Sequence, residues 1–129
     1  MAVLRDSKLK RVLQWGDVRR RKLGTWAYAL NRVTGLGLVV YLYLHLVVLS
    51  RLAQGPEAWE AFVALAKTPP FLALDVVLLA GLLIHGLNGL RVTLNGFGIG
   101  VRAQKPLFIA LMVIAAVASI VGGAAIFFQ

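Results

Sequence analysis

Three long apolar runs dominate this sequence and leave few folds open to it. They cover residues 28–50, 71–90 and 107–128. Each has about 20 residues or more, enough to cross a hydrocarbon layer of about 30 Å as a helix. A helix also satisfies its backbone polar groups internally, as a lipid environment requires. We therefore expect an all-α fold in which residues 28–129 form one domain of three transmembrane helices. The hydrophobic fraction of 60% agrees with this expectation.

The charged residues predict how these helices are oriented. Residues 1–27 hold eight Lys or Arg side chains against two Asp. With the N-terminus inside, the inner segments hold twelve basic residues and the outer loop holds two. Basic residues concentrate on the cytoplasmic side of membrane proteins, so we expect a cytoplasmic N-terminus and an external C-terminus in the cell (inner) membrane. The net charge of +9 sits mainly at the ends of apolar runs, which favours membrane orientation and not nucleic-acid binding.

The remaining segments are interpreted as connections. Residues 1–27 suit a short amphipathic helix on the membrane surface, a solvated basic tail or a contact with a soluble partner. Residues 51–70 are expected to form a polar loop, and residues 91–106, with the spacing G-x-G-x-G, a flexible turn. No cleavable signal peptide is expected, because the first apolar run begins late. The chain has no cysteine, so any haem would be held without a covalent link.

His85 is the most informative residue of the second run. Gly81 and Gly89 lie four residues before and after it, so one helix face carries an imidazole between two residues without side chains. Such a face suits a flat ligand, with His85 on a haem iron and Gly89 making room for the porphyrin. It equally suits a close helix–helix contact with a hydrogen-bonded histidine. These residues alone leave both interpretations open.

His45 is the second histidine within the apolar runs, and it lies at another depth. Helix rise places His45 about 25 Å and His85 about 9 Å from the inner end of their spans. A difference of roughly 16 Å prevents both from binding one iron. If both are ligands, they hold two haems, an inner one at His85 and an outer one at His45. The missing axial ligands must then come from another chain, which predicts an obligate oligomer.

Three arginines are candidates for anionic or carbonyl groups. Arg91 lies inward of His85 and Arg51 beyond His45, so each is placed to meet the propionates of one haem. Both also suit a role as interfacial anchors. Arg32 lies inside the first span beside Asn31, where it can hydrogen-bond a quinone carbonyl or a propionate, or extend to the lipid headgroups.

Two stretches resemble the cytochrome b subunit of succinate dehydrogenase. Residues 31–35 (NRVTG), followed by Tyr41-Leu42 and His45-Leu46, are similar to its first-helix signature, usually His-Arg-x-Ser/Thr-Gly. Residues 85–91 (HGLNGLR) are similar to its second-helix signature, His-x-x-x-Gly-x-Arg. The sequence departs from the usual family pattern at four positions. Asn31 and Val92 stand where histidine is usual. Tyr28 stands where many members have serine, and Gly96 where aspartate is usual.

The resemblance implies a membrane anchor that binds haem b together with a second anchor subunit. That partner would supply the other axial histidines, and an iron–sulfur subunit and an FAD flavoprotein would dock on the inner face. Electrons would pass from succinate to quinone, or in reverse for a fumarate reductase. The likeness implies His85 as the haem ligand, His45 as the extra ligand of the two-haem members, and a quinone site at Arg32 with Tyr28 and Asn31.

Two other classes of protein fit the residues. A small subunit of a transporter or channel could use His85, His45 and Asp75 as a proton path. Three spans do not, however, form the inverted repeat expected of many transporters. A purely structural assembly subunit is the other alternative.

Overall fold

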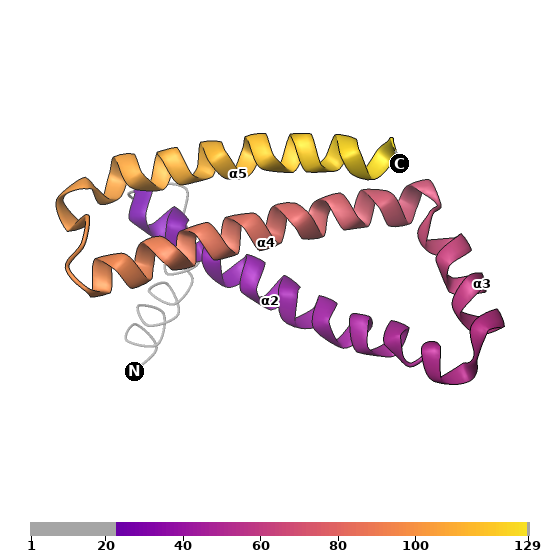
Figure 1. The fold of residues 1–129 in the computed structure, drawn as a ribbon. Coiled ribbons are helices and arrows are strands. Elements are labelled where there is room, and N and C mark those ends of the chain that lie inside the picture. Colours follow the sequence, from indigo (N-terminus) through magenta and orange to yellow (C-terminus); the bar gives the residue numbers. More distant parts are fainter. Residues whose placement is uncertain (1–22, 129) are drawn as a thin grey trace, which may run out of the picture.

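Three long helices make up the computed structural model, which describes residues 23–128. Helix α2 spans Leu23–Leu49, α4 spans Pro69–Gly96 and α5 spans Gln104–Phe127 (Figure 1). All three are long and apolar enough to cross a membrane. This agrees with the three expected spans and with the all-α class. The possible amphipathic helix within residues 1–27 lies largely outside the described residues.

Both connections contain helix where the sequence predicted loops. Residues 51–70 include the short 3-10 helix η1 (Leu52–Gln54) and helix α3 (Pro56–Ala66), which begins with proline at its first position. Proline is tolerated there because the first N–H of a helix has no intrahelical partner. The second loop is shorter than predicted, because α4 continues to Gly96 and η2 (Val101–Ala103) leads directly into α5. The turn itself falls at Gly98 and Gly100, whose φ angles are +80° and +74°.

Helices α4 and α5 run antiparallel and in contact along their length, whereas α2 crosses α4 near one end and diverges toward α3 (Figure 1). Small residues permit the close approach of α5. A Cβ added at Gly122 would lie 2.5 Å from a Leu79 methyl carbon, and one at Gly123 would lie 3.1 Å from a methyl carbon of Val76. Tight packing at small residues is the usual means by which membrane helices associate.

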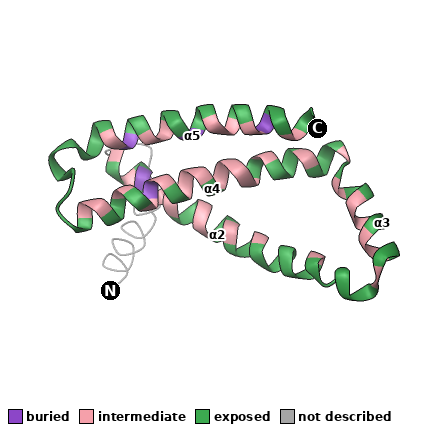
Figure 2. Ribbon diagram, in the orientation of Figure 1, coloured by how far each residue is buried: buried purple, intermediate pink, exposed green. Residues whose placement is uncertain are grey.

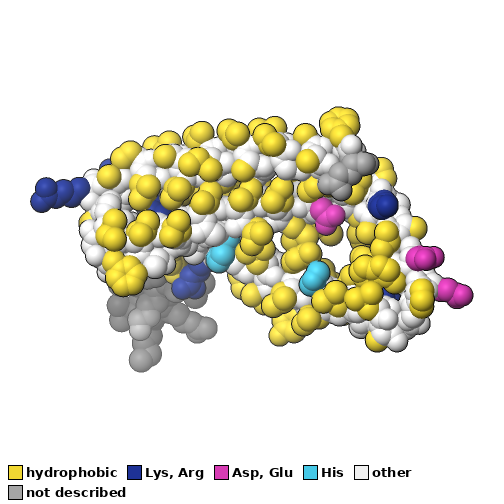
Figure 3. Space-filling model, viewed as in Figure 1, with side chains coloured by type: hydrophobic (Ala, Val, Ile, Leu, Met, Phe, Trp, Pro, Cys, Tyr) yellow, Lys and Arg dark blue, Asp and Glu magenta, His cyan; other side chains and the backbone are white. Residues whose placement is uncertain are grey.

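Few residues are buried, and they lie at helix contacts (Figure 2). Hydrophobic side chains cover most of the face seen in Figure 3, on which both histidines are visible. This distribution suits a chain whose surroundings are lipid and other membrane helices. The buried residues at the helix contacts include one polar side chain: Ala27, Asn88, Phe108, Ala115 and Gly123.

Candidate functional site

The His85 ring lies against α2 and is oriented by hydrogen bonds. Its Nδ1 is 3.0 Å from the backbone oxygen of Asn31 and 3.3 Å from the Thr34 hydroxyl. A carbonyl oxygen only accepts, so Nδ1 carries a proton and donates it. The Thr34 hydroxyl donates its own proton to the carbonyl of Leu30 at 2.7 Å, so it too accepts from His85. In the neutral ring, Nε2 therefore carries the lone pair, which is the arrangement that a metal-binding histidine requires.

Glycines surround the His85 ring in two different ways. At Gly35 of α2, an added Cβ would lie 2.9 Å from the His85 Cε1 atom, so the ring needs a residue without a side chain opposite it. At Gly81 and Gly89 of α4, an added Cβ would meet no atom within 4 Å. The two glycines that flank His85 on α4 therefore border open space. The close contact at Gly35 was not foreseen, although Gly35 belongs to the first-helix motif.

A cavity beside Gly81 extends this open space. It has a volume of about 520 Å³ and lies between α2 and α4, with Thr34, Gly37 and Leu38 on one side and Val77, Gly81 and Ile84 on the other. Its size is within the range of small-molecule and cofactor sites. The cavity lies close to the His85 ring, because its lining includes Thr34, whose hydroxyl contacts that ring.

A second cavity lies at the end of the structure where α2 crosses α4, and we call it the crossing cavity. It has a volume of about 400 Å³. The structure brings together here the three predicted quinone-binding residues and Arg91, which was predicted to meet a haem propionate. The complete lining is Gly24, Ala27, Tyr28, Asn31, Arg32, Asn88, Arg91 and Val92.

The two arginines of the crossing cavity are held by aromatic rings. The Arg32 guanidinium lies 4.9 Å from the centre of the Tyr28 ring, and that of Arg91 lies 5.0 Å from the Phe108 ring. Arg91 also donates to the backbone oxygen of Gln104 at 3.4 Å, which ties α4 to the start of α5. Stacking of this kind positions a charged group while its remaining N–H groups stay available to a ligand.

Asn88 is a member of this cavity that sequence reasoning missed. Its side chain is fully buried, and its Nδ2 donates to the backbone oxygen of Ala27 on α2 at 2.8 Å. The signal that could have revealed it is an amide side chain within an apolar run, three residues after His85 on a neighbouring part of the same face.

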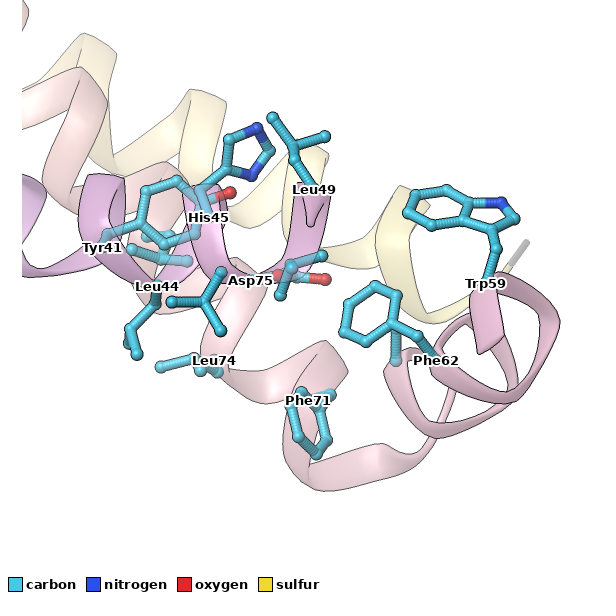
Figure 4. Close-up of a pocket in the computed structure, with 13 residues that line it drawn as sticks. Tyr41, Leu44, His45, Leu49, Trp59, Phe62, Phe71, Leu74 and Asp75 are labelled. Atoms are coloured by element: carbon cyan, nitrogen blue, oxygen red, sulfur yellow. The ribbon is translucent and has the colours of Figure 1, made fainter. Parts of the chain in front are cut away.

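His45 lies at the opposite end of α2, in a cavity of about 400 Å³ that we call the α3 cavity (Figure 4). Tyr41 and His45 reach it from α2, Trp59 and Phe62 from α3, and Asp75 from α4. The His45 ring is exposed, and its centre is 5.6 Å from that of Tyr41. Within residues 23–128, no three His, Asp or Glu side chains gather as a metal site, so each histidine stands as a single candidate ligand.

The structure agrees with the estimated separation of the two histidines. His85 packs against Gly35, and His45 lies ten residues further along α2 (45 − 35 = 10), or about 15 Å along the helix axis. One iron cannot reach both. Arg51, predicted to serve a haem at His45, follows the end of α2, is exposed and hydrogen-bonds Gln54 at 3.2 Å. Its role as a propionate partner stays a prediction.

Fold and site together define a small membrane subunit of three helices, with an oriented histidine and a polar cavity between its first two spans. The chain belongs to the succinate dehydrogenase/fumarate reductase transmembrane subunit family, whose pattern matches residues 5–123. It is 36% identical over 107 residues to the succinate dehydrogenase hydrophobic membrane anchor subunit of Halobacterium salinarum, covering 82% of each chain.

Two further similarities point the same way. The chain is 32% identical over 95 residues to the succinate dehydrogenase 2 membrane subunit of Mycobacterium tuberculosis, covering 74% of this chain and 66% of that one. It is also 34% identical over 58 residues to a fumarate reductase subunit of Vibrio vulnificus, covering 45% of this chain and 46% of the other. Membership of this family replaces the hypothesis of a transporter or channel subunit.

Proposed function

We propose that this chain is the haem b-binding anchor subunit of a succinate:quinone oxidoreductase, with His85 as an axial ligand. One observation carries the proposal: Nδ1 of His85 donates to the Asn31 carbonyl, which leaves the Nε2 lone pair for iron. Open space at Gly81 and Gly89, four residues before and after His85 on α4, supports it. When bound, haem b supplies one-electron transfer between the iron–sulfur subunit and quinone.

The crossing cavity is the proposed quinone site. Arg32 and Tyr28 can donate to a quinone carbonyl, and Asn31 joins the cavity to His85, because its backbone oxygen accepts from the His85 ring. A quinone here would lie within one helix turn of the proposed haem ligand. We place this end at the cytoplasmic face, where the iron–sulfur and FAD subunits would dock, on the basis of the charge asymmetry.

His45 is proposed to hold a second haem at the outer face. The α3 cavity beside it and the separation of about 15 Å along α2 from Gly35, which touches His85, support this assignment. One chain provides one histidine at each depth, so a second anchor subunit would supply the opposite axial ligands. Arg91 and Arg51 are our candidates for the propionates of the inner and the outer haem.

The absorbance spectrum of the purified complex tests the proposal. His85→Ala should remove one haem, seen as a lower haem-to-protein ratio and a smaller reduced α band, while the complex still assembles. Thr93→Val is a matched control, because Thr93 is exposed on the same helix and donates only to the backbone of Gly89 at 3.0 Å. An unchanged haem content in His85→Ala would refute the proposal.

A further inference from the structure

The orientation of the Asn88 amide follows from its surroundings. Its side chain is fully buried between α2 and α4, and Nδ2 lies 2.8 Å from the Ala27 backbone oxygen. That oxygen only accepts, so the NH₂ group must face it. The amide oxygen Oδ1 is thereby turned to the other side of the side chain. Asn88 lines the crossing cavity, and its hydrogen-bond acceptor is held in a fixed direction, away from the Ala27 carbonyl.

This acceptor has no hydrogen-bond partner in the part of the chain that the structure describes. Oδ1 of Asn88 is buried and finds no hydrogen-bond donor within residues 23–128. Leaving a buried acceptor without a donor is unfavourable, because the atom has lost its hydrogen bonds to water. The contact between α2 and α4 uses only the Nδ2 group of Asn88, so it does not explain the presence of the amide oxygen. A ligand that brings a donor to the cavity would satisfy it.

Other polar atoms of the crossing cavity limit which hydrogen-bonding groups such a ligand can carry. Oδ1 of Asn31 is a second buried acceptor, and Nε of Arg91 a buried donor, each without a partner in the described part of the chain. Arg32 and Tyr28 add further donor groups. A ligand that matches this wall must both donate and accept hydrogen bonds.

The two redox forms of a quinone differ in this respect. The oxidised form has carbonyl oxygens, which only accept. Reduction adds two electrons and two protons, so each oxygen becomes a hydroxyl that donates as well as accepts. A haem propionate is acceptor-only, so it could pair with Arg91 or Arg32 but could not satisfy the oxygens of Asn88 and Asn31. The hydroquinone is therefore the form that complements the cavity.

We infer that Asn88 Oδ1 accepts a hydrogen bond from a hydroxyl of hydroquinone in the crossing cavity. Asn88 thereby determines how strongly the site holds the reduced form relative to the quinone. This inference rests on the proposed quinone site. It adds Asn88 to the residues of that site, beside Arg32 of the first-helix motif. At the same time, Asn88 links α4 to α2 through the hydrogen bond from its Nδ2 to the Ala27 backbone oxygen.

Product inhibition of the purified complex tests the role of Asn88. Succinate:quinone reductase activity is measured with a short-chain quinone, and inhibition constants are determined for its hydroquinone and for the hydroquinone dimethyl ether. The ether keeps both oxygens but has no hydroxyl to donate. Asn88→Leu should raise the inhibition constant of the hydroquinone about threefold to tenfold, the range expected for one hydrogen bond. The constant of the ether and the KM for quinone should change less than about twofold, since neither ligand donates to Asn88.

Asn95→Leu is the matched control. Asn95 lies on the same helix, seven residues on, and its Oδ1 also lacks a partner in the described residues, but it does not line the crossing cavity. It should leave all three constants unchanged. Asn88→Ala provides a second variant, which removes the amide oxygen and adds neither bulk nor a new hydrogen-bond acceptor. It should raise the hydroquinone constant in the same way.

The outcomes separate the inference from the proposed function. An equal rise for hydroquinone, ether and quinone would show that Asn88 only holds the two helices together, and would overturn the inference. Unchanged constants in both Asn88 variants would show that another group, such as water, satisfies Oδ1, and would also overturn it. A wild-type complex that oxidises succinate with a soluble dye but neither reduces quinone nor binds hydroquinone would overturn the proposed function itself.

Discussion

The two histidines of this chain lie on neighbouring helices but in different surroundings. At the crossing of α2 and α4, backbone oxygens of α2 accept hydrogen bonds from His85 and Asn88, so both side chains have one defined orientation. At the α3 cavity, His45 is exposed, and no hydrogen bond to its ring is found within residues 23–128. Asp75, the ionisable neighbour, is exposed in the same cavity.

This difference shows what each region requires from other molecules. An ionisable side chain at membrane depth needs a partner, and a histidine that binds metal usually has its second nitrogen hydrogen-bonded. The crossing region supplies that second bond from within the chain. The α3 region leaves it to a partner subunit, to water or to a ligand. The crossing region is therefore the better-formed half of the proposed electron path.

The largest expected effect that tests the comparison between the His85 and His45 regions is the loss of a complete haem. His45→Ala should remove one b-type component in a redox titration of the purified complex, and that component should differ from the one lost in His85→Ala. The physical reason is depth, because about 15 Å along α2 separates His45 from the level of His85. A single haem per complex that His45→Ala leaves untouched would contradict the two-haem proposal and leave His85 as the one ligand on this chain.

A smaller effect should separate the two cavities by their chemistry. Arg32→Ala removes a charged donor from the crossing cavity and should lower quinone reductase activity about tenfold or more, as expected for a hydrogen bond from a charged group. Succinate oxidation with a soluble dye should be retained. Asp75→Asn removes the charge in the α3 cavity and should leave both activities close to wild type. An equal loss of both activities in Arg32→Ala would indicate a defect of assembly.

The smallest expected effect concerns the packing that orients His85. Gly35→Ala places a methyl group 2.9 Å from the His85 Cε1 atom, so the ring must shift. We expect a loss of stability of about 1 kcal/mol, at the low end of the cost of overpacking, and a shifted spectrum of the haem that His85 binds. Thermal unfolding followed by haem absorbance measures both quantities. Gly86→Ala is the control, because an added Cβ there meets no atom within 4 Å. Equal behaviour of the two variants would show that the contact at Gly35 does not orient the ring.

Much of the fold was predictable from local pattern. Apolar runs of sufficient length predict membrane helices because lipid leaves no other partner for the backbone. The ends of the helices were predicted less well. The second span was expected to stop before Arg91, but α4 continues to Gly96, and Arg91 within it stacks on Phe108 and donates to Gln104. Helix α3 was missed because residues 51–70 were interpreted as a polar loop, although Pro56 also suits a helix start.

The candidate site, like the fold, was predictable from the sequence only in part. His85 was identified from its position between Gly81 and Gly89, which depends only on the periodicity of one helix. The contacts of His85 with Asn31, Thr34 and Gly35 depend on where α2 crosses α4, and no spacing within either helix specifies that crossing. The interpretation of His85 as a helix–helix contact was correct as far as its hydrogen bonds go. That contact leaves the lone pair on Nε2, so it is compatible with the proposed haem ligand.

The sequence by itself determined the three spans, the membrane environment and the difference in depth between His45 and His85, because these follow from hydropathy and from the fixed rise of a helix. Only the tertiary structure decided which atoms meet at the crossing. Hydrogen bonds from His85 and Asn88 to backbone oxygens of α2 carry no signature in the sequence, because every residue has a carbonyl oxygen. The packing of α2 on α4 selects the carbonyls of Ala27 and Asn31, and with them the protonated nitrogen of His85 and the direction of the Asn88 oxygen.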